Sequence, residues 1–189
     1  MGRVKYIINT EGHPDHVLGN AFFEGVVIAQ QGAKDNFGAS LEKIGEVSER
    51  IRELDPKGMR FLNGYVPKEP MITFDHRLTL YSGDQLIELI NLPGHTPDQI
   101  AVFIPKERVV FTGDNVVYRT RPFYHRCQPR EWMKSLQYLK TMQFDVLIPG
   151  HGEVCGKEAL DEMLSYNNEI FEQIERAIEQ GLSKQETLE

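Results

Sequence analysis

Four side chains of types that bind metal ions lie within six residues near the start of the sequence. Residues 11–16 read EGHPDH and follow directly on an apolar run. Alternate residues of an extended segment point the same way, so Glu11, His13 and Asp15 can share one side. His16 then faces elsewhere. Because imidazole nitrogens and carboxylate oxygens suit zinc, iron or manganese, we expect the loop to serve two neighbouring ions, one through its first two ligands and one through its last two.

Three further candidate ligands follow predicted strands, and a glycine precedes each of them. They are His95 in LPGHTPD, Asp114 in FTGDN and His151 in IPGHG. Glycine lets the backbone turn sharply and approach a ligand closely. Pro-Gly and Gly-Asp pairs are also ordinary turn signals, and a single histidine after a strand is more often a surface or core residue. The compact cluster together with three such positions favours one shared rim of metal ligands.

The segments that must position these residues include strand-like and helix-like patterns, with no repeat and no obvious interdomain linker. Short apolar runs predict strands at residues 4–9, 26–29, 72–74, 77–81, 85–90, 101–104, 108–112 and 146–148. Residues 10–16 are expected to form a polar loop. Helical spacing of apolar residues predicts helices at 41–54, 130–142 and 157–180, and Ser183 with Glu186 forms a capping box before another helix. We therefore expect one layered α/β domain over residues 1–189, in which helices cover the sheets.

Composition narrows the classes of function. The 189 residues are enough for one domain with a hydrophobic core, and the formal net charge is −7. A negative protein repels phosphate backbones, so no nucleic-acid partner is expected. No apolar run approaches the ~20 residues that cross a membrane, and no signal peptide is visible. Two cysteines, Cys127 and Cys155, are too few for a disulfide framework, so we expect a cytoplasmic protein.

A loop after Asp114 carries polar side chains that could rim the pocket. Its candidate substrate-binding residues are Tyr118, Arg121 and His125. An arginine in such a loop can hold an acidic or polar group of a small-molecule substrate. A solvated surface loop is the simpler alternative for this segment.

The order and spacing of the candidate ligands resemble those of the metallo-β-lactamase superfamily. That family's signature is His-x-His-x-Asp-His after a strand, then a histidine in a Gly-His-Thr context, an aspartate after a strand, and a final Gly-His. This sequence has the last three ligands of the first motif and all of the later ones, from Val4 to about Gln180. Asn9-Thr10 before the motif and Gly19-Asn20 after it also fit. The resemblance implies an αββα sandwich that lacks the usual N-terminal segment.

The resemblance also implies a ligand set for two divalent ions. The first ion takes Glu11, His13 and His95, the second takes Asp15, His16 and His151, and Asp114 bridges them. Zinc is the first expectation, with manganese or iron as alternatives. A water or hydroxide between the ions is then the nucleophile, since a bound ion lowers the pKa of water. Asp15 is the candidate catalytic residue, which orients this nucleophile or passes a proton to the leaving group.

The sequence departs from the family pattern in two ways. Glu11 stands where the family usually has histidine, which favours manganese or iron, or else leaves a site for one ion with Glu11 solvated. The first motif begins at residue 11, whereas family members usually have several strands and a helix before it. The chain is then a fragment, a truncated product, or a protein that completes its core with another subunit. Exposed edges left by such a loss favour a homo-oligomer.

The resemblance implies a metal-dependent hydrolase of a small ester, thioester or lactone. Asp114, rather than cysteine, at the bridging position points away from β-lactamases that use a thiolate there. Two alternatives stay open. One is a non-catalytic or weakly active member that binds metal or a partner. The other is a diiron oxygen or nitric oxide reductase-like domain, although such relatives place their carboxylate elsewhere in the first motif and usually carry a flavin domain.

Overall fold

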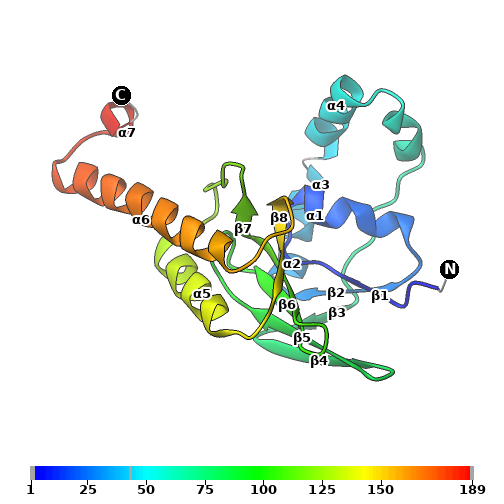
Figure 1. Cartoon of the computed structure of the whole chain (residues 1–189). Helices are drawn as coiled ribbons and strands as arrows, with labels where there is room; N and C mark the ends of the chain where they lie inside the picture. Colours follow the sequence, from blue (N-terminus) through cyan, green and yellow to red (C-terminus); the bar gives the residue numbers. More distant parts are fainter. Residues whose placement is uncertain (1–2, 43, 188–189) are drawn as a thin grey trace.

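The computed structural model describes residues 3–42 and 44–187, and their strands form two sheets (Figure 1). The smaller sheet is parallel, in the order β1 (Tyr6–Ile8), β2 (Val26–Gln30) and β3 (Ile72–Phe74). The larger sheet has the order β4 (Arg77–Ser82), β5 (Gln85–Asn91), β6 (Ile100–Ile104), β7 (Val109–Tyr118) and β8 (Val146–Gly152). Its neighbouring strands are antiparallel, except that β7 and β8 are parallel. Every predicted strand is present, although several boundaries differ.

The two sheets pack face to face because side chains alternate along the strands. Ile100 and Val102 of β6 join a buried cluster with Ile28 of β2 and Leu89 of β5, so this cluster draws on both sheets. Ala101, between them in the sequence, belongs to a second cluster on the opposite face of the larger sheet. Because successive side chains of a strand point to opposite faces, both faces of the larger sheet are buried.

Helices cover the outer faces of both sheets. The larger sheet is covered by α5 (Pro129–Thr141) and α6 (Glu158–Glu179) (Figure 1). Trp132, Leu136 and Leu139 of α5 are fully buried in the second cluster, as their spacing predicts. The short helix α2 (Gln31–Asp35) contacts β2 and β3 of the smaller sheet. The layers confirm the predicted αββα sandwich.

The remaining helical segments are short. They are α1 (Pro14–Val17), η1 (Leu18–Phe22), α3 (Phe37–Glu42), α4 (Ile44–Leu54), η2 (Gly58–Leu62) and α7 (Lys184–Thr187), where η marks a 3-10 helix. The predicted helix at 41–54 is two segments, α3 and α4, and Lys43 lies outside the described residues. The first of these segments begins earlier than predicted, at the buried Phe37, whereas the helical spacing of apolar residues indicates a start at residue 41. In the part of the chain that the structure describes, no helix is long and apolar enough to cross a membrane.

The predicted capping box is present before α7. The Ser183 hydroxyl accepts a hydrogen bond from the backbone N–H of Glu186, at 3.3 Å. The Glu186 carboxylate accepts one from the backbone N–H of Ser183, at 2.8 Å. These two bonds satisfy donors that the first turn of a helix otherwise leaves free.

Strands β7 and β8 extend further than their apolar runs predict. The sequence suggests strand ends before Asp114 and His151, but pairing continues as far as Tyr118 and Gly152. Register shifts on either side of Gly113, whose φ is +50°, make this stretch irregular without ending the strand. The prediction that both ligands follow strand ends is therefore wrong: they lie within strands, at and beyond a local distortion.

The first ligand loop also contains a helical turn that the sequence analysis did not predict. Residues 10–16 were expected to be a loop, but α1 begins at Pro14. Proline suits the first turn of a helix, because its φ is already fixed and a backbone N–H at that position would have no acceptor within the helix. The chain at His13 is still extended, with φ −66° and ψ 150°. The ligand motif therefore changes once, from extended backbone at His13 to a helical turn that carries Asp15 and His16.

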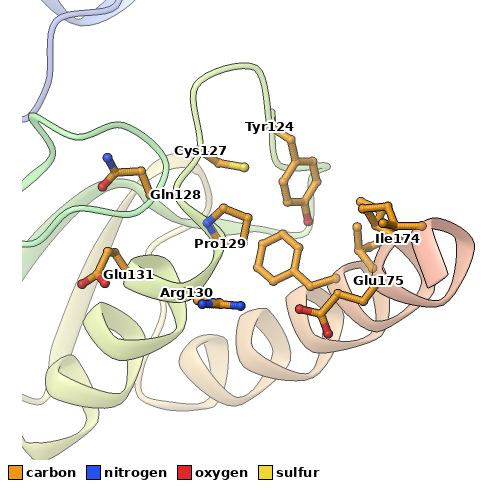
Figure 2. A pocket seen from close by; sticks show the side chains of 11 residues that line it. Tyr124, Cys127, Gln128, Pro129, Arg130, Glu131, Ile174 and Glu175 are labelled. Atoms are coloured by element: carbon orange, nitrogen blue, oxygen red, sulfur yellow. The ribbon is translucent and has the colours of Figure 1, made fainter. Parts of the chain in front are cut away.

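A groove of about 620 Å³ opens between residues 124–131 and α6 (Figure 2). Tyr124, Phe171 and Ile174 contribute to its mainly apolar lining. The hydroxyl of Tyr124 donates a hydrogen bond to Oδ1 of Asn167 at 2.8 Å. The described residues that line this groove include none of the predicted metal ligands, so it is not the candidate site.

Candidate metal centre

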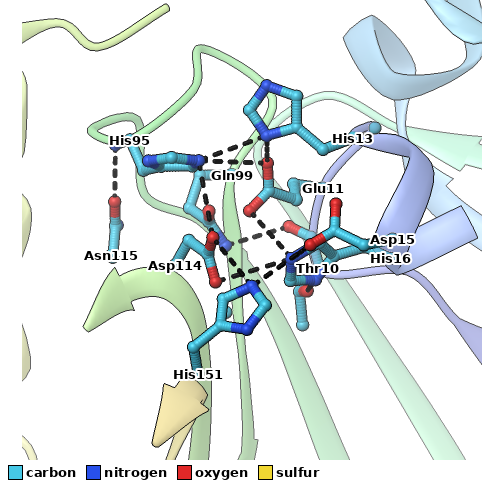
Figure 3. A network of polar contacts seen from close by, with 12 residues as sticks. Thr10, Glu11, His13, Asp15, His16, His95, Gln99, Asp114, Asn115 and His151 are labelled. Atoms are coloured by element: carbon cyan, nitrogen blue, oxygen red, sulfur yellow. Dashed lines mark hydrogen bonds and ion pairs between the residues drawn. The ribbon is translucent and has the colours of Figure 1, made fainter. Parts of the chain in front are cut away.

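The seven predicted ligands meet at one place, beyond the end of β1 and beside the irregular part of β7 and β8 (Figure 3). Their donor atoms form three overlapping sets, which are Glu11 with His13 and His95, Asp15 with His16 and His151, and Glu11 with His16 and Asp114. Within each set the donor atoms lie within 4.8 Å of one another. The first two sets are the ligand groups that the resemblance implies.

Asp114 lies between these two groups. Its Oδ1 is 3.5 Å from Nε2 of His16. Its Oδ2 is 3.6 Å from Nε2 of His95 and 3.5 Å from Nε2 of His151. The carboxylate therefore faces histidines of both groups, the position expected of a bridging ligand.

Glu11 also faces both groups, from the buried side of the cluster. Its Oε2 is 2.5 Å from Nδ1 of His13 and 3.6 Å from Nε2 of His95. Its Oε1 is 3.7 Å from Nε2 of His16. Because the side chain has no exposed surface, Glu11 is not the solvated residue that the one-ion alternative assumes.

The cluster is open on one side. The side chains of Asp15 and His151 are 57% and 49% exposed, and their Oδ2 and Nε2 atoms are 3.1 Å apart. His95 and Glu11, by contrast, are buried. The second ligand group is therefore the more exposed of the two, although His13 and His95 of the first group also line the cleft above the cluster.

The carboxylates favour positive charge in this pocket. Burial lowers the pKa of His16, but the three carboxylates around it outweigh this effect and raise the pKa to about 9. Burial raises the pKa of Asp114, but the surrounding histidines outweigh it and leave that pKa below its usual value. For His95 burial is the stronger influence, and it lowers the pKa. The donors are thus arranged to hold cations, whether protons or metal ions.

Several buried donor atoms in the cluster lack a hydrogen-bond partner among the described residues. They include both carboxylate oxygens of Glu11, Nε2 of His16 and Oδ1 of Asp114. Buried polar atoms are normally paired, since an unpaired one costs about 1–3 kcal/mol. These atoms converge on one another and are the atom types that bind divalent ions. The residues therefore fit a metal centre.

A buried carboxylate outside the cluster holds the first ligand loop. Oδ2 of Asp98 accepts a hydrogen bond from the backbone N–H of Gly12 at 2.8 Å, between two predicted ligands. Arg126 lies 3.9 Å from the other oxygen of Asp98. Asp98 is not among the predicted site residues, and its only local signal is its position three residues after His95. Such supporting bonds keep ligands oriented.

Two asparagines fix the start and the end of the same loop. The side-chain amides of Asn9 and Asn20 exchange two hydrogen bonds, both 2.9 Å long. Asn9 also donates to the carbonyl oxygen of His16 at 2.9 Å. The sequence analysis noted both asparagines as fitting the family pattern, and the structure shows that they brace the loop.

Asn115 and Trp132 position His95. Oδ1 of Asn115 accepts a hydrogen bond from the backbone N–H of His95 at 2.9 Å, and Nε1 of Trp132 donates to the carbonyl oxygen of Asn115 at 3.0 Å. The rings of His95 and Trp132 meet edge to face, with centroids 5.6 Å apart. Trp132 is a core residue, as expected, and it also forms one wall of the site.

We expect that Gly150→Ala will weaken metal binding and stability. A Cβ at residue 150 would lie 1.9 Å from Oδ1 of Asp114 and 2.7 Å from the backbone nitrogen of Asp114, so a side-chain rotation alone cannot relieve the clash. Overpacking of this kind costs about 1–3 kcal/mol. Metal per chain and the melting temperature should both fall. Gly19→Ala is the control, because a Cβ there meets nothing within 4 Å; equal losses in both variants would contradict the prediction.

A cleft of about 720 Å³ opens over the exposed side of the cluster. Of the predicted substrate-binding residues, Arg121 lines it. Tyr118 and His125 are not among the described residues of its lining. Tyr118 packs against the helix-covered core, and the ring of His125 lies beside that of Phe123.

The opposite wall of this cleft comes from α4, which the sequence analysis did not connect with the site. Val47, Ile51 and Leu54 line the cleft together with Arg50. Their helical spacing is the usual signal of a face buried in the core, and sequence spacing alone does not distinguish a core from a cleft. No local signal could have identified these residues.

Comparisons with known proteins agree with this geometry. The sequence profile of the metallo-beta-lactamase superfamily matches residues 2–151. The chain is 25% identical over 222 residues to a linear primary-alkylsulfatase from Pseudomonas sp. (strain ATCC 19151). This match covers 98% of this chain and 42% of that protein. It is 23% identical over 145 residues to a hydroxyacylglutathione hydrolase from Erythrobacter litoralis (strain HTCC2594), covering 77% of this chain and 47% of that protein. The chain thus spans less than half the length of these curated relatives.

Solved structures give the same fold. The metallo-beta-lactamase FIM-1 from Pseudomonas aeruginosa, in its mono-zinc form, superposes with a TM-score of 0.64 at 18% identity. The match covers 88% of this chain and 67% of that one. The superfamily profile covers most of the sequence and includes every candidate ligand from Glu11 to His151. On this evidence the chain belongs to the metallo-beta-lactamase superfamily.

Proposed function

We propose that this chain is a metal-dependent hydrolase of small esters, thioesters or lactones. The observation that carries the proposal is the convergence of seven donor side chains into overlapping sets, with buried donor atoms that have no hydrogen-bond partner among the described residues. Glu11, His13 and His95 would hold one ion, Asp15, His16 and His151 would hold a second, and Asp114 would contribute to both. Zinc is the preferred ion, and the extra carboxylate of Glu11 makes manganese or iron the alternatives.

When bound, divalent ions supply an activated water and polarise the oxygen of the scissile group. Asp15 is the residue proposed to move protons. Its carboxylate is more than half exposed and lies at the floor of the cleft. A carboxylate there can accept a proton from the attacking water and return it to the leaving oxygen or sulfur. Oδ2 of Asp15 lies 3.1 Å from Nε2 of His151, so both side chains face the place where the second ion would bind.

The relatives support hydrolysis as the reaction class. The hydroxyacylglutathione hydrolase is named for hydrolysis, and the alkylsulfatase is named for alkyl sulfates. Their identities of 23% and 25% are too low to transfer a substrate. We therefore include a sulfate ester among the substrates to be tested.

Metal content and turnover together test the proposal. We expect purified protein loaded with zinc, manganese or iron to bind about two ions per chain by mass spectrometry, and to hydrolyse at least one of a thioester, a lactone, a phosphodiester and an alkyl sulfate. A chelator should abolish turnover, and added metal should restore it. Bound metal without turnover on any of these substrates would support the non-catalytic alternative, and an iron absorption band would support the diiron alternative.

A further inference from the structure

The cleft over the metal cluster has two walls that come from distant parts of the sequence. One wall is α4, and the other is the segment after β7 that contains Thr120, Arg121 and Phe123. The floor includes Asp15 and His151. Any molecule that reaches the cluster from solvent through this cleft must lie against these walls.

The walls carry apolar side chains that other parts of the protein leave uncovered. Val47, Ile51 and Leu54 project from one face of α4 into the cleft lining, and Phe123 lies in the opposite wall. Leu54 is 75% exposed and Phe123 is 63% exposed. Covering such side chains with an apolar group is favourable, because it removes apolar surface from water. The walls therefore suit an apolar chain.

Two arginines accompany these apolar side chains. Arg50 and Arg121 line the cleft, one from each wall. Among the residues that the structure describes, neither forms an ion pair or a side-chain hydrogen bond, whereas Arg119 on the same segment pairs with Glu153. Guanidinium groups bind carboxylate and sulfate oxygens through paired hydrogen bonds. The two arginines are therefore available to an anion in the cleft.

Acidic residues near Arg50 lie outside this cleft. Glu46, Glu49 and Glu53 of α4 line a neighbouring surface hollow that also includes Arg50 and Leu54, and none of these three carboxylates lines the cleft itself. At the floor, two divalent ions would more than neutralise the carboxylates of Glu11, Asp15 and Asp114. Above a loaded centre, the described lining of the cleft then has no uncompensated carboxylate, although the chain as a whole has a net charge of −7.

We propose that the substrates are amphipathic anionic esters, in which an apolar chain lies along Val47, Ile51, Leu54 and Phe123 while Arg121 and Arg50 hold a negative group. This inference rests on the proposed hydrolase function and specifies its substrate class. Hydrolysis consumes one water: its oxygen bonds to the acyl carbon or sulfur, the bond to the leaving oxygen breaks, and a proton passes to that oxygen. The negative group is either the scissile ester itself, as in an alkyl sulfate, or a separate carboxylate.

Binding of octane-1-sulfonate tests the cleft independently of turnover, because this molecule has no bond that the protein can hydrolyse. By calorimetry with metal-loaded protein, we expect it to bind more tightly than octan-1-ol. Arg121→Gln should weaken sulfonate binding about tenfold with unchanged metal content, since a charged hydrogen bond is lost. Arg119→Gln is the matched control and should leave the affinity unchanged. Equal sulfonate affinity in the wild type, Arg121→Gln and Arg50→Gln would overturn the proposal.

Chain length tests the apolar wall. In the wild type, affinity should rise from butane-1-sulfonate to octane-1-sulfonate, and Leu54→Ser should reduce this gain severalfold. Leu182→Ser is the control for loss of an exposed leucine, because Leu182 is not among the described residues that line the cleft. No rise in affinity with chain length in the wild type would contradict the role of this wall.

Kinetics then separate the two sources of the negative group. Octyl sulfate carries it at the scissile bond, 3-carboxyphenyl octanoate carries it on the leaving group, and phenyl octanoate has none. We expect Arg121→Gln to raise KM for an anionic substrate, with little change in kcat, and to leave KM for phenyl octanoate unchanged. Arginine-dependent sulfonate binding without hydrolysis of any of the three would count against the proposed function alone. Equal KM values for the two octanoate esters, with no turnover of octyl sulfate, would overturn the substrate class alone.

Discussion

His16→Ala is expected to lose metal and activity together. Nε2 of His16 lies 3.5 Å from Oδ2 of Asp15, 3.5 Å from Oδ1 of Asp114 and 3.7 Å from Oε1 of Glu11, so one side chain faces every carboxylate of the cluster. Loss of a residue that merely supports a ligand typically costs 10–100-fold in metal affinity or activity, so loss of a ligand should cost at least about 100-fold. Mass spectrometry of bound metal and rates on the best substrate of the panel will measure both.

The control for this variant is His76→Ala. His76 is an exposed histidine between β3 and β4, outside the cluster, and its backbone carbonyl accepts a hydrogen bond from Asn91 that alanine retains. This variant should keep its metal and its activity. If His16→Ala instead retained two ions and full turnover, the two-ion assignment would be wrong.

Glu11→Gln is expected to have a similarly large effect on metal binding, with little change of shape. Glu11 is fully buried, and its two oxygens face His13, His95 and His16. Glutamine keeps the volume but removes the charge and places N–H groups among the histidines. We expect the metal-dependent rise in melting temperature to shrink, because a ligand that binds the folded state stabilises it in proportion to its affinity.

Glu11→His distinguishes loss of a ligand from loss of packing. Histidine restores the usual family residue and should bring zinc affinity back to the wild-type value or above it, while glutamine should not. Zinc titrations of the two variants and the wild type will show the order. The same stoichiometry and affinity in all three proteins would exclude Glu11 as a ligand.

The convergence of the candidate ligands could be predicted from the sequence because its signals are local. Residues 11–16 carry four donor types in a single loop, and the other three donors each follow a glycine. Those glycines have a steric reason: a Cβ at Gly94 would lie 2.3 Å from Oδ1 of Asn115, and one at Gly113 would lie 2.2 Å from Nε2 of Gln99. The glycines that precede the candidate ligands in the sequence are therefore also the residues that leave space for neighbouring side chains of the site.

The surroundings of the site could not be predicted, because they depend on contacts between distant residues. The hydrogen bond from Gly12 to Asp98 joins residues 86 positions apart, and nothing near either residue indicates the other. The extent of β7 was missed for a related reason. Gly113 indicates the end of a strand, whereas β7 continues to pair with β8 on both sides of the distortion at Gly113.

The helix α4 packs chiefly on its neighbours in the chain, α3 and η2, although it forms one wall of the cleft. The ligands, in contrast, are anchored by the two sheets and by buried asparagines. Residues of α4 and of the ligand loop thus line the same cleft but are held by different parts of the fold. Substitutions on the cleft side of α4 would therefore remodel the entrance while the framework of the candidate ligands stays in place.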